Sequence, residues 1–298
     1  MRKVLVTGTT GLVGSRIYEY LRENTSWEIL GTSRSSGRYV DVVADLRDRT
    51  AVAELSSSVH ADAVIHTAAI ARTDVCDKFR DLCYETNVSA ACNLAGAYPG
   101  SKFVFFSTYA VYNTPEGRCN EGCATNPANY YIETKLKAEE CVKRLQDYVI
   151  FRPSVIFGYT DFIRESKNYF MQLLDNIRQE KVMRSPDDQY FNPIHVDVVA
   201  ELVCRAIDRD LHGIYNIGCN EDISKYAFNR MVMERFGFDG RFLEGIASQT
   251  LAVKRPNMGT VSSAKVQQDL SFEIPPLSAM IDSLYASSSE NVAAYLNG

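Results

Sequence analysis

Tyr131 and Lys135 are four residues apart, a spacing that places two side chains on one face of a helix. A lysine ammonium close to a phenol lowers the pKa of the phenol from its ordinary value of ~10. Such a tyrosine exchanges a proton with a carbonyl or alcohol oxygen near neutral pH. Ser107 and Thr108, which follow an apolar run, each offer a hydroxyl to the same oxygen. These residues predict a ketone–alcohol redox site, provided that a hydride carrier binds beside them.

A glycine turn near the start of the sequence offers a place for such a carrier. Lys3–Thr7 is a β-branched run typical of a buried parallel strand, and residues 15–22 have helical periodicity. The glycines between them are spaced Gly-x-x-Gly-x-x-Gly, which differs from the common Gly-x-Gly-x-x-Gly pattern. In this context we favour a pyrophosphate bound at the helix N-terminus over a plain tight turn. The predicted cofactor-binding residues of the turn are Gly8, Thr10, Gly11, Leu12, Val13 and Gly14.

The end of the second predicted strand, residues 27–33, indicates which dinucleotide binds. An acidic residue at this position would hold the ribose 2′-hydroxyl of NAD, but the sequence has Ser33 and Arg34. Arg34 can pair with a 2′-phosphate instead. The sequence therefore favours NADP(H) and leaves NAD(H) open, as it leaves open that Arg34 is only a solvated loop arginine.

Alternating strands and helices along the first half predict an α/β fold with a doubly wound parallel sheet. We expect residues 1–158 to form the main part of a Rossmann domain. Residues 159–298 are expected to form mostly a smaller C-terminal α/β substrate lobe, with segments that return to the main domain. The expected strands are 39–43, 63–66, 102–106, 147–152 and 213–218; the expected helices are 49–58, 81–98, 131–146, 164–181, 198–209 (capped by Asp197) and 225–236; residues 182–194 are expected to be a loop.

Several residues near the carboxyl ends of the predicted strands are further cofactor-site candidates, because ligands of such sheets bind at these ends. Asp45 is expected either to accept from an adenine amino group or to cap the helix 49–58. Asn87 either links the site lysine to water or is a buried amide that bonds to backbone. His66 is expected to be a structural histidine. The remaining candidates are Leu46, the small residues Thr67, Ala68 and Ala69, and Pro153.

Composition narrows the class of protein. The chain has 298 residues, of which 46% are hydrophobic and 23% charged, as in an ordinary soluble globular protein. A net charge of −5 without a basic tract argues against nucleic acid as a partner. The sequence has no apolar run of the ~18 residues that a membrane span needs. Its start leads into a strand rather than a signal peptide, so we expect a cytoplasmic location.

The eight cysteines could suggest a metal site or disulfides. Only Cys119 and Cys123 are close in sequence, and neither a second pair nor a nearby histidine accompanies them. We therefore expect no metal site, and we expect the cysteines to be buried free thiols.

Together these motifs resemble extended short-chain dehydrogenase/reductases, and in particular the dTDP-4-dehydrorhamnose reductase family. The resemblance extends from the glycine turn through Asp45-Leu46, Thr67-Ala68-Ala69, Ser107-Thr108 and residues 129–136 to late motifs such as Arg255-Pro256-Asn257. It implies an NADPH-dependent reductase of a 4-keto-6-deoxy sugar nucleotide, acting in dTDP-rhamnose biosynthesis.

The resemblance also implies roles for individual residues. Thr108, Tyr131 and Lys135 would form the catalytic triad: Tyr131 protonates the keto oxygen, Thr108 polarises it, and Lys135 lowers the tyrosine pKa and binds the nicotinamide ribose. Arg164 and Arg255 are candidates for the substrate phosphates, with surface charge as the alternative. Tyr109, beside the substrate, departs from the family pattern and is closer to the epimerases.

Three alternatives remain open. An epimerase of the same superfamily would keep NAD tightly bound, which Ser33 and Arg34 do not favour. A dehydratase would need an Asp-Glu pair where the chain has Tyr109-Ala110. A non-catalytic NADP-binding regulatory subunit is the third, because the β subunit of methionine adenosyltransferase resembles this family. The sequence also leaves open whether the chain forms a homodimer.

Overall fold

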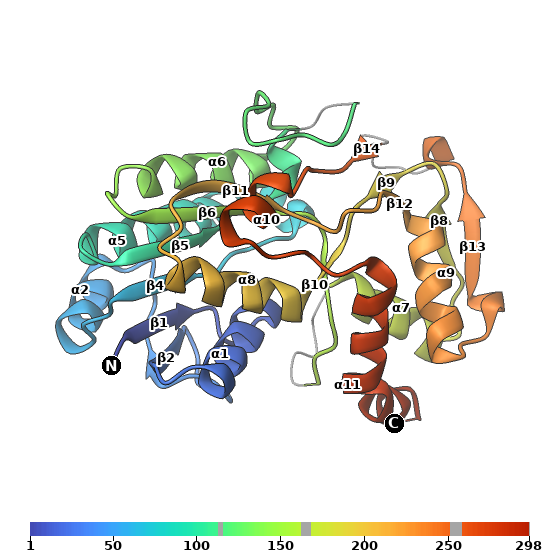
Figure 1. Ribbon diagram of the computed structural model, residues 1–298, viewed down its shortest axis with the longest axis horizontal. Helices are drawn as coiled ribbons and strands as arrows, with labels where there is room; N and C mark the ends of the chain where they lie inside the picture. Colours follow the sequence, from blue (N-terminus) through green and yellow to red (C-terminus); the bar gives the residue numbers. More distant parts are fainter. Residues whose placement is uncertain (113–115, 162–167, 251–257, 298) are drawn as a thin grey trace. The chain divides into compact units, whose positions relative to one another are not determined.

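The computed structural model describes residues 1–112, 116–161, 168–250 and 258–297. A seven-stranded sheet has the strand order β11-β6-β5-β4-β1-β2-β3 (Figure 1). The pairs from β3 to β6 are all parallel, and the order reverses between β1 and β4, as in doubly wound folds. The predicted doubly wound sheet is thereby confirmed. Its strands are β1 (Lys3–Thr7), β2 (Glu28–Ser33), β3 (Val42–Val43), β4 (Ala63–His66), β5 (Lys102–Phe106), β6 (Tyr148–Pro153) and β11 (Gly213–Ile217).

The central strands form because their residues are apolar on both faces and helices cover each face. On one face, Leu5, Phe103, Phe105 and Ile150 pack against helices in one continuous core. The helices that contribute to this core are α2 (Arg49–Ser58), α5 (Ala90–Ala97) and α6 (Tyr130–Val142). Helices α1 (Leu12–Asn24) and α8 (Val196–Asp208) lie over the other face (Figure 1).

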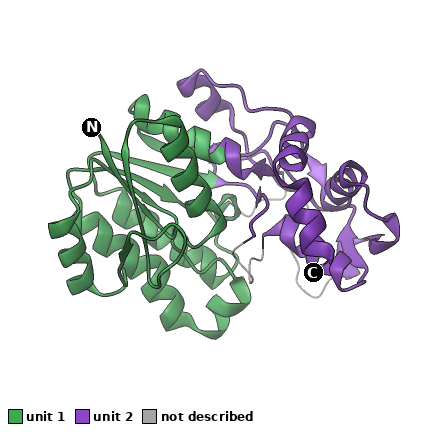
Figure 2. Cartoon of the chain, turned by 90° about the horizontal axis from the view of Figure 1, so that it is seen from below, with its two compact units in different colours: residues 1–112, 124–152, 199–215 green, residues 113–123, 153–198, 216–298 purple. Residues whose placement is uncertain are grey.

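The chain divides into two compact units, coloured in Figure 2. The first contains residues 1–112, 124–152 and 199–215, so that most of α8 and the start of β11 belong with the N-terminal strands. The second contains residues 113–123, 153–198 and 216–298.

Within the described residues of the second unit, short strands pack with the helices α7, α9, α10 and α11. Its strands pair as β10 with β7, β12-β9-β14 and β13 with β8. The helices α9 and α11 contact each other, and α11 also contacts α7. The elements are β7 (Ile156–Phe157), α7 (Tyr169–Arg178), β8 (Met183–Pro186), β9 (Tyr190–Phe191), β10 (Ile194–His195), β12 (Ile223–Ser224), α9 (Lys225–Phe236), η3 (Gly240–Phe242), β13 (Leu243–Ile246), η4 (Ser248–Thr250), β14 (Met258–Gly259), α10 (Ala264–Leu270) and α11 (Leu277–Asn297).

Three local predictions are wrong. The strand predicted over 39–43 is reduced to β3, because residues 37–40 form a turn and the Asp41 carboxylate accepts from the backbone N–H of Gly31. The loop predicted over 182–194 contains β8, β9 and the first residue of β10. Asp197 does not cap α8, since it already lies in the first turn of that helix.

The cysteine prediction is also wrong, because the structure contains two disulfides, Cys76–Cys83 and Cys92–Cys141. The first joins α3 (Thr73–Lys78) to α4 (Arg80–Tyr84), and the second joins α5 to α6. The paired residues are brought together by helix packing, which a search for closely spaced pairs cannot detect. Cys119, Cys123, Cys204 and Cys219 are free thiols.

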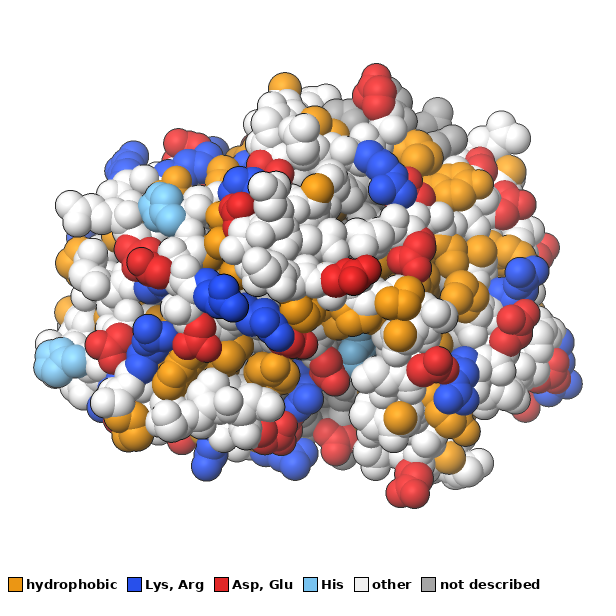
Figure 3. Space-filling view, in the orientation of Figure 1, with side chains coloured by type: hydrophobic (Ala, Val, Ile, Leu, Met, Phe, Trp, Pro, Cys, Tyr) orange, Lys and Arg blue, Asp and Glu red, His pale blue; other side chains and the backbone are white. Residues whose placement is uncertain are grey.

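Charges of both signs are interspersed over the face of the molecule shown in Figure 3, without a broad patch of either sign. Among the described residues, no helix has the length and hydropathy needed to cross a membrane. No group of three or more potential metal-ligating side chains gathers within that part of the chain.

Candidate functional site

The turn between β1 and α1 can be built only with glycine at two positions. Gly8 has φ +74°, and a Cβ there would lie 2.7 Å from the backbone nitrogen of Ala68. A Cβ on Gly14 would lie 2.4 Å from the carbonyl oxygen of Gly8. The turn therefore packs directly on the segment that follows β4, where Thr67 donates from its hydroxyl to the carbonyl of Thr7 at 2.6 Å.

The N-terminus of α1 suits an anion. Gly11 is the N-cap and provides no side-chain cap, so the first N–H groups of the helix, starting at Leu12 and Val13, keep their capacity to donate. The buried hydroxyl of Thr9 has no hydrogen-bond partner among the described residues. The hydroxyls of Thr10 and Ser33, 3.0 Å apart, tie this turn to the end of β2. These features fit the pyrophosphate of a dinucleotide.

Arg34 and Asp45 lie near each other beyond the ends of β2 and β3. Arg34 is exposed, and its charge contributes to a lowered pKa of Asp45, whose main cause is the hydrogen-bonded guanidinium of Arg47. Asp45 does not cap α2, as one alternative held. That cap is Asp48, whose carboxylate accepts from the N–H of Thr50 at 2.8 Å. Leu46 beside Asp45 is buried.

His66 ends β4 inside the protein. Its Nδ1 lies 2.8 Å from the Thr7 hydroxyl, and its ring stacks on Phe105 with centroids 5.9 Å apart. Burial and the nearby Lys135 lower the pKa of His66 to about 3, so this histidine is neutral at physiological pH. The expectation of a structural histidine agrees with these contacts.

Asn87 lies in a π-helical turn, η1 (Glu85–Ser89), between α4 and α5. Its amide oxygen accepts from the N–H of Ile70 at 2.8 Å, and its nitrogen donates to the carbonyl of Ile70 and to the hydroxyl of Thr134, both at 3.1 Å. These bonds to Ile70 are those expected of a buried amide that bonds to backbone. Asn87 connects the segment after Ala69 to the helix that carries Tyr131.

That helix, α6, is capped by Asn129, whose side chain accepts from the N–H of Ile132 at 3.1 Å. Helix α6 contacts β5 and the short helix η2 (Tyr109–Val111) that follows it. Thr108 caps η2 and accepts from the N–H of Ala110 at 3.2 Å. The fold thus brings the element that bears Tyr131 and Lys135 against the strand end that bears Thr108.

The electrostatics of this pair differ from the prediction. Burial raises the pKa of Tyr131 to about 12, with a further contribution from Tyr109. Burial lowers the pKa of Lys135 to about 7, and Glu139 opposes this shift. The ammonium lies 4.3 Å from the centroid of the Phe105 ring. The expected lowering of the tyrosine pKa is wrong here, because loss of solvent disfavours the phenolate and Lys135 is not among the groups that shift the pKa of Tyr131.

Sequence reasoning missed a buried ionic network one helical turn beyond Lys135. The Glu139 carboxylate accepts from the Ser107 hydroxyl at 2.5 Å and from Arg152 Nε and Nη2 at 3.0 and 2.6 Å. Arg152 also donates to the Tyr112 hydroxyl at 2.9 Å. The available signal was an acidic residue on the apolar face of α6. Since Ser107 is committed to Glu139, Thr108 is the hydroxyl left for a ligand.

The sequence profile described as "RmlD substrate binding domain" matches residues 1–289 of this chain. The chain belongs to this family. The family match confirms the resemblance that the motifs predicted, and it covers nearly the whole sequence.

Several relatives and solved structures are similar over most of the RmlD-family chain. It is 27% identical to methionine adenosyltransferase 2 subunit beta from Danio rerio over 95% of the chain and 90% of the relative. It shares the fold of a dTDP-4-dehydrorhamnose reductase from Clostridium acetobutylicum, with a TM-score of 0.82 and 24% identity over 95% and 99% of the two chains. The same enzyme from Bacillus anthracis, solved with NADP, gives a TM-score of 0.83 and 22% identity over 96% and 100%.

Of the remaining predicted site residues of the RmlD-family chain, Pro153 and Tyr109 lie within the described part of the structure. Pro153 is buried at the end of β6, and Tyr109 is half-buried at the start of η2. Arg164 and Arg255, predicted to bind substrate phosphates, lie outside the described residues and stay predictions.

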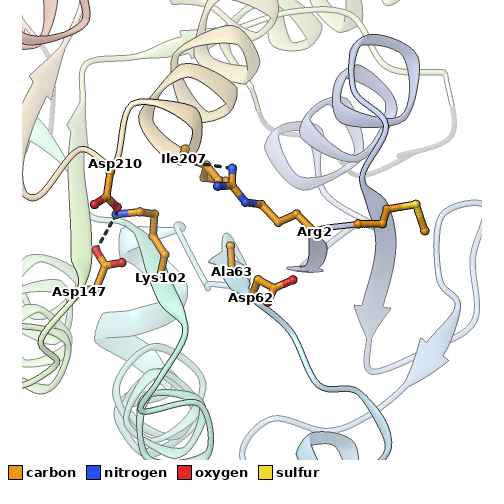
Figure 4. A pocket seen from close by; sticks show the side chains of 8 residues that line it. Arg2, Asp62, Ala63, Lys102, Asp147, Ile207 and Asp210 are labelled. Atoms are coloured by element: carbon orange, nitrogen blue, oxygen red, sulfur yellow. Dashed lines mark hydrogen bonds and ion pairs between the residues drawn. The ribbon is translucent and has the colours of Figure 1, made fainter.

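A pocket also opens at the opposite, amino end of the sheet (Figure 4). Lys102 at its wall is buried, with its ammonium 2.5 Å from Asp147, 2.9 Å from Asp210 and 3.0 Å from the carbonyl of Leu211. Because these three acceptors satisfy the ammonium, we interpret the cluster as a structural tie between the end of α8 and strands β5 and β6.

Proposed function

We propose that this chain is an NADPH-dependent reductase that converts the keto group of a 4-keto-6-deoxy sugar nucleotide into an alcohol. The observation that carries the proposal is the packing of α6, with Tyr131 and Lys135, against β5 and η2, where Thr108 lies. The glycine turn and the open N-terminus of α1 support dinucleotide binding. Membership of the RmlD family and the names of its reductase relatives support the sugar-nucleotide substrate.

NADPH, when bound, supplies the hydride. The chain supplies the rest: Tyr131 donates a proton to the keto oxygen, and the Thr108 hydroxyl donates a hydrogen bond to the same oxygen as negative charge develops. The raised pKa of Tyr131 keeps the phenol protonated at neutral pH, which is the form that reduction needs. Lys135 in its cationic form stabilises the phenolate that remains.

In this proposal, one set of residues selects the cofactor and another binds the sugar-nucleotide substrate. Arg34, exposed beyond β2, would pair with the 2′-phosphate of NADPH, while Asp45-Leu46 and Thr67-Ala68-Ala69 would line the adenine and ribose. Arg164 and Arg255 would bind the substrate phosphates. We place the reaction in the cytoplasm.

The decisive experiment incubates the purified chain with NADPH and a panel of dTDP- and UDP-linked 4-keto-6-deoxyhexoses and follows NADPH oxidation. We expect turnover with at least one dTDP-linked sugar, and faster turnover with NADPH than with NADH. NADPH binding without oxidation of NADPH by any member of the panel would contradict the reductase.

A second function is favoured by one observation, the similarity to methionine adenosyltransferase 2 subunit beta over 95% of the chain. In this alternative the chain binds NADP and regulates a catalytic partner. NADPH binding without turnover, together with altered kinetics of a methionine adenosyltransferase catalytic subunit on addition of the chain, would favour it over the reductase.

A further inference from the structure

Glu139 is a charged residue in a place where charge is costly. It is fully buried on α6, four residues after Lys135, and thus on the same face of the helix. A buried carboxylate persists only when it is paired and hydrogen-bonded. Glu139 meets this condition through Arg152 and Ser107, which come from the ends of two adjacent strands, β6 and β5.

Glu139 is connected to the proposed catalytic residues in two ways, through Ser107 to Thr108 and along α6 to Lys135. Ser107, held at 2.5 Å by the carboxylate, is the residue immediately before Thr108. Along the helix, the carboxylate lies one turn from Lys135 and acts on it electrostatically. We propose that Glu139 is a positioning residue: its carboxylate fixes the end of β5 next to Thr108 and is the counter-ion of Lys135.

The groups that face Lys135 leave Glu139 as its balancing charge. From β4, His66 is neutral, because its pKa is lowered to about 3. From β5, the Phe105 ring contributes only its π-face. On α6 itself, Tyr131 is protonated, with a pKa of about 12.

The groups that face Glu139 are cationic or hydroxylic. Arg152 from β6 donates to the carboxylate through two nitrogens. Lys143, the C-cap of α6, places its Nζ 3.5 Å from Glu139 Oε2. Arg152 is itself shared with Tyr112. The single negative charge of Glu139 therefore acts on three cations, Arg152, Lys143 and Lys135.

Removing the carboxylate charge should make Lys135 lose its proton at lower pH. An opposite charge nearby shifts a pKa by about one unit or more. In Glu139→Gln we therefore expect the pKa of Lys135 to fall by about one unit from its value of about 7. The catalytic consequence rests on the proposed reductase function: the alkaline limb of the kcat/KM profile should move to lower pH by the same interval.

The test titrates Lys135 directly, by NMR of the full chain labelled at lysine Cε, with Lys135→Met to assign the signal. Glu140→Gln is the matched control, because it makes the same change on the same helix at a mostly exposed side chain. We expect the Lys135 titration to move in Glu139→Gln and to stay in Glu140→Gln. An unmoved titration in Glu139→Gln would overturn the proposal, whether or not the chain proves to be a reductase.

Glu139→Gln leaves Arg152 buried without its partner and can fail to fold. In that case the double variant Glu139→Gln, Arg152→Gln removes both charges and keeps two side chains that can hydrogen-bond each other. We expect the Lys135 titration still to fall below that of the wild type, because Glu139 is the charge that acts on Lys135. A wild-type titration in the double variant would overturn the counter-ion role.

Discussion

Tyr131 and Lys135 lose solvent on the same face of α6, and this loss sets their protonation. The phenol is protonated at neutral pH, while Lys135, with a pKa of about 7, gains a proton below that pH and loses it above. A reductase needs both protons in place at once. The proposed reaction should therefore be faster on the acidic side of neutrality.

A single substitution, Tyr131→Phe, tests the proposed role of Tyr131 as proton donor. Tyr131→Phe keeps the ring and removes the hydroxyl, so we expect kcat to fall by about 10²- to 10⁴-fold while NADPH affinity is retained. Tyr130→Phe is the matched control, since Tyr130 is adjacent and contacts Arg80 through its ring alone. For both variants, the rate of reduction of a 4-keto sugar nucleotide gives kcat, and a titration with NADPH gives the cofactor affinity. Full activity in Tyr131→Phe would show that another group donates the proton.

Residue spacing pointed to Tyr131 and Lys135, and the family resemblance pointed to Thr108. The elements that bear them are in contact, while their catalytic roles stay predictions. Spacing was insufficient for Glu139, whose partners come from β5 and β6 and meet only in the folded sheet. Residue spacing also predicted the wrong direction for the pKa shift of Tyr131, because the distance between residues in sequence carries no information about burial.

Several restraints from neighbouring elements converge on helix α6. Asn87 in the π-turn donates to Thr134, Cys92 on α5 is bonded to Cys141, and Glu139 ties it to two strands. A π-turn is frequent at functional sites, and here Asn87 lies within it.

The disulfides predict a redox-dependent stability. Linking Cys92 to Cys141 closes 49 residues and should stabilise the fold by about 4 kcal/mol, and linking Cys76 to Cys83, only 7 apart, by about 2 kcal/mol. Urea unfolding with and without dithiothreitol checks this. The Cys92→Ser, Cys141→Ser variant should respond less to the reductant, and Cys123→Ser, at a free thiol, should respond as the wild type. The same urea midpoint for the wild type with and without dithiothreitol would contradict the prediction.

Element length decided which parts of the fold could be predicted from sequence. Strands β1, β4 and β5 and helix α2 have the predicted bounds, because continuous apolar runs or a full helical period identify them. The two-residue strands β9 and β10 are too short to show alternation, and long-range pairing alone creates them. The π-turn within the predicted helix 81–98 has no distinct composition.

At the scale of the whole molecule, the two units are interleaved in sequence. Residues 199–215 belong to the first unit although they follow a long stretch of the second. Within them, Val199, Leu202, Val203 and Ala206 of α8 are buried.

A fragment of residues 1–158, predicted from sequence as the main part of the Rossmann domain, should therefore not fold by itself. It lacks α8 and the edge strand β11, which leaves β6 without its outer neighbour. We expect the fragment to bind a hydrophobic dye and to unfold without cooperativity, whereas the full chain unfolds cooperatively. Calorimetry and dye fluorescence check this. A sharp unfolding transition of the fragment would contradict the prediction.

The position of β11 at the edge of the sheet also bears on synthesis of the chain. A ribosome releases β6 well before it releases residues 213–217, a delay on the order of seconds at typical elongation rates. During that interval the nascent sheet presents a bare strand, a template for unwanted pairing with other chains. The nascent chain is thus expected to depend on a holding chaperone until the last strand of its sheet has emerged.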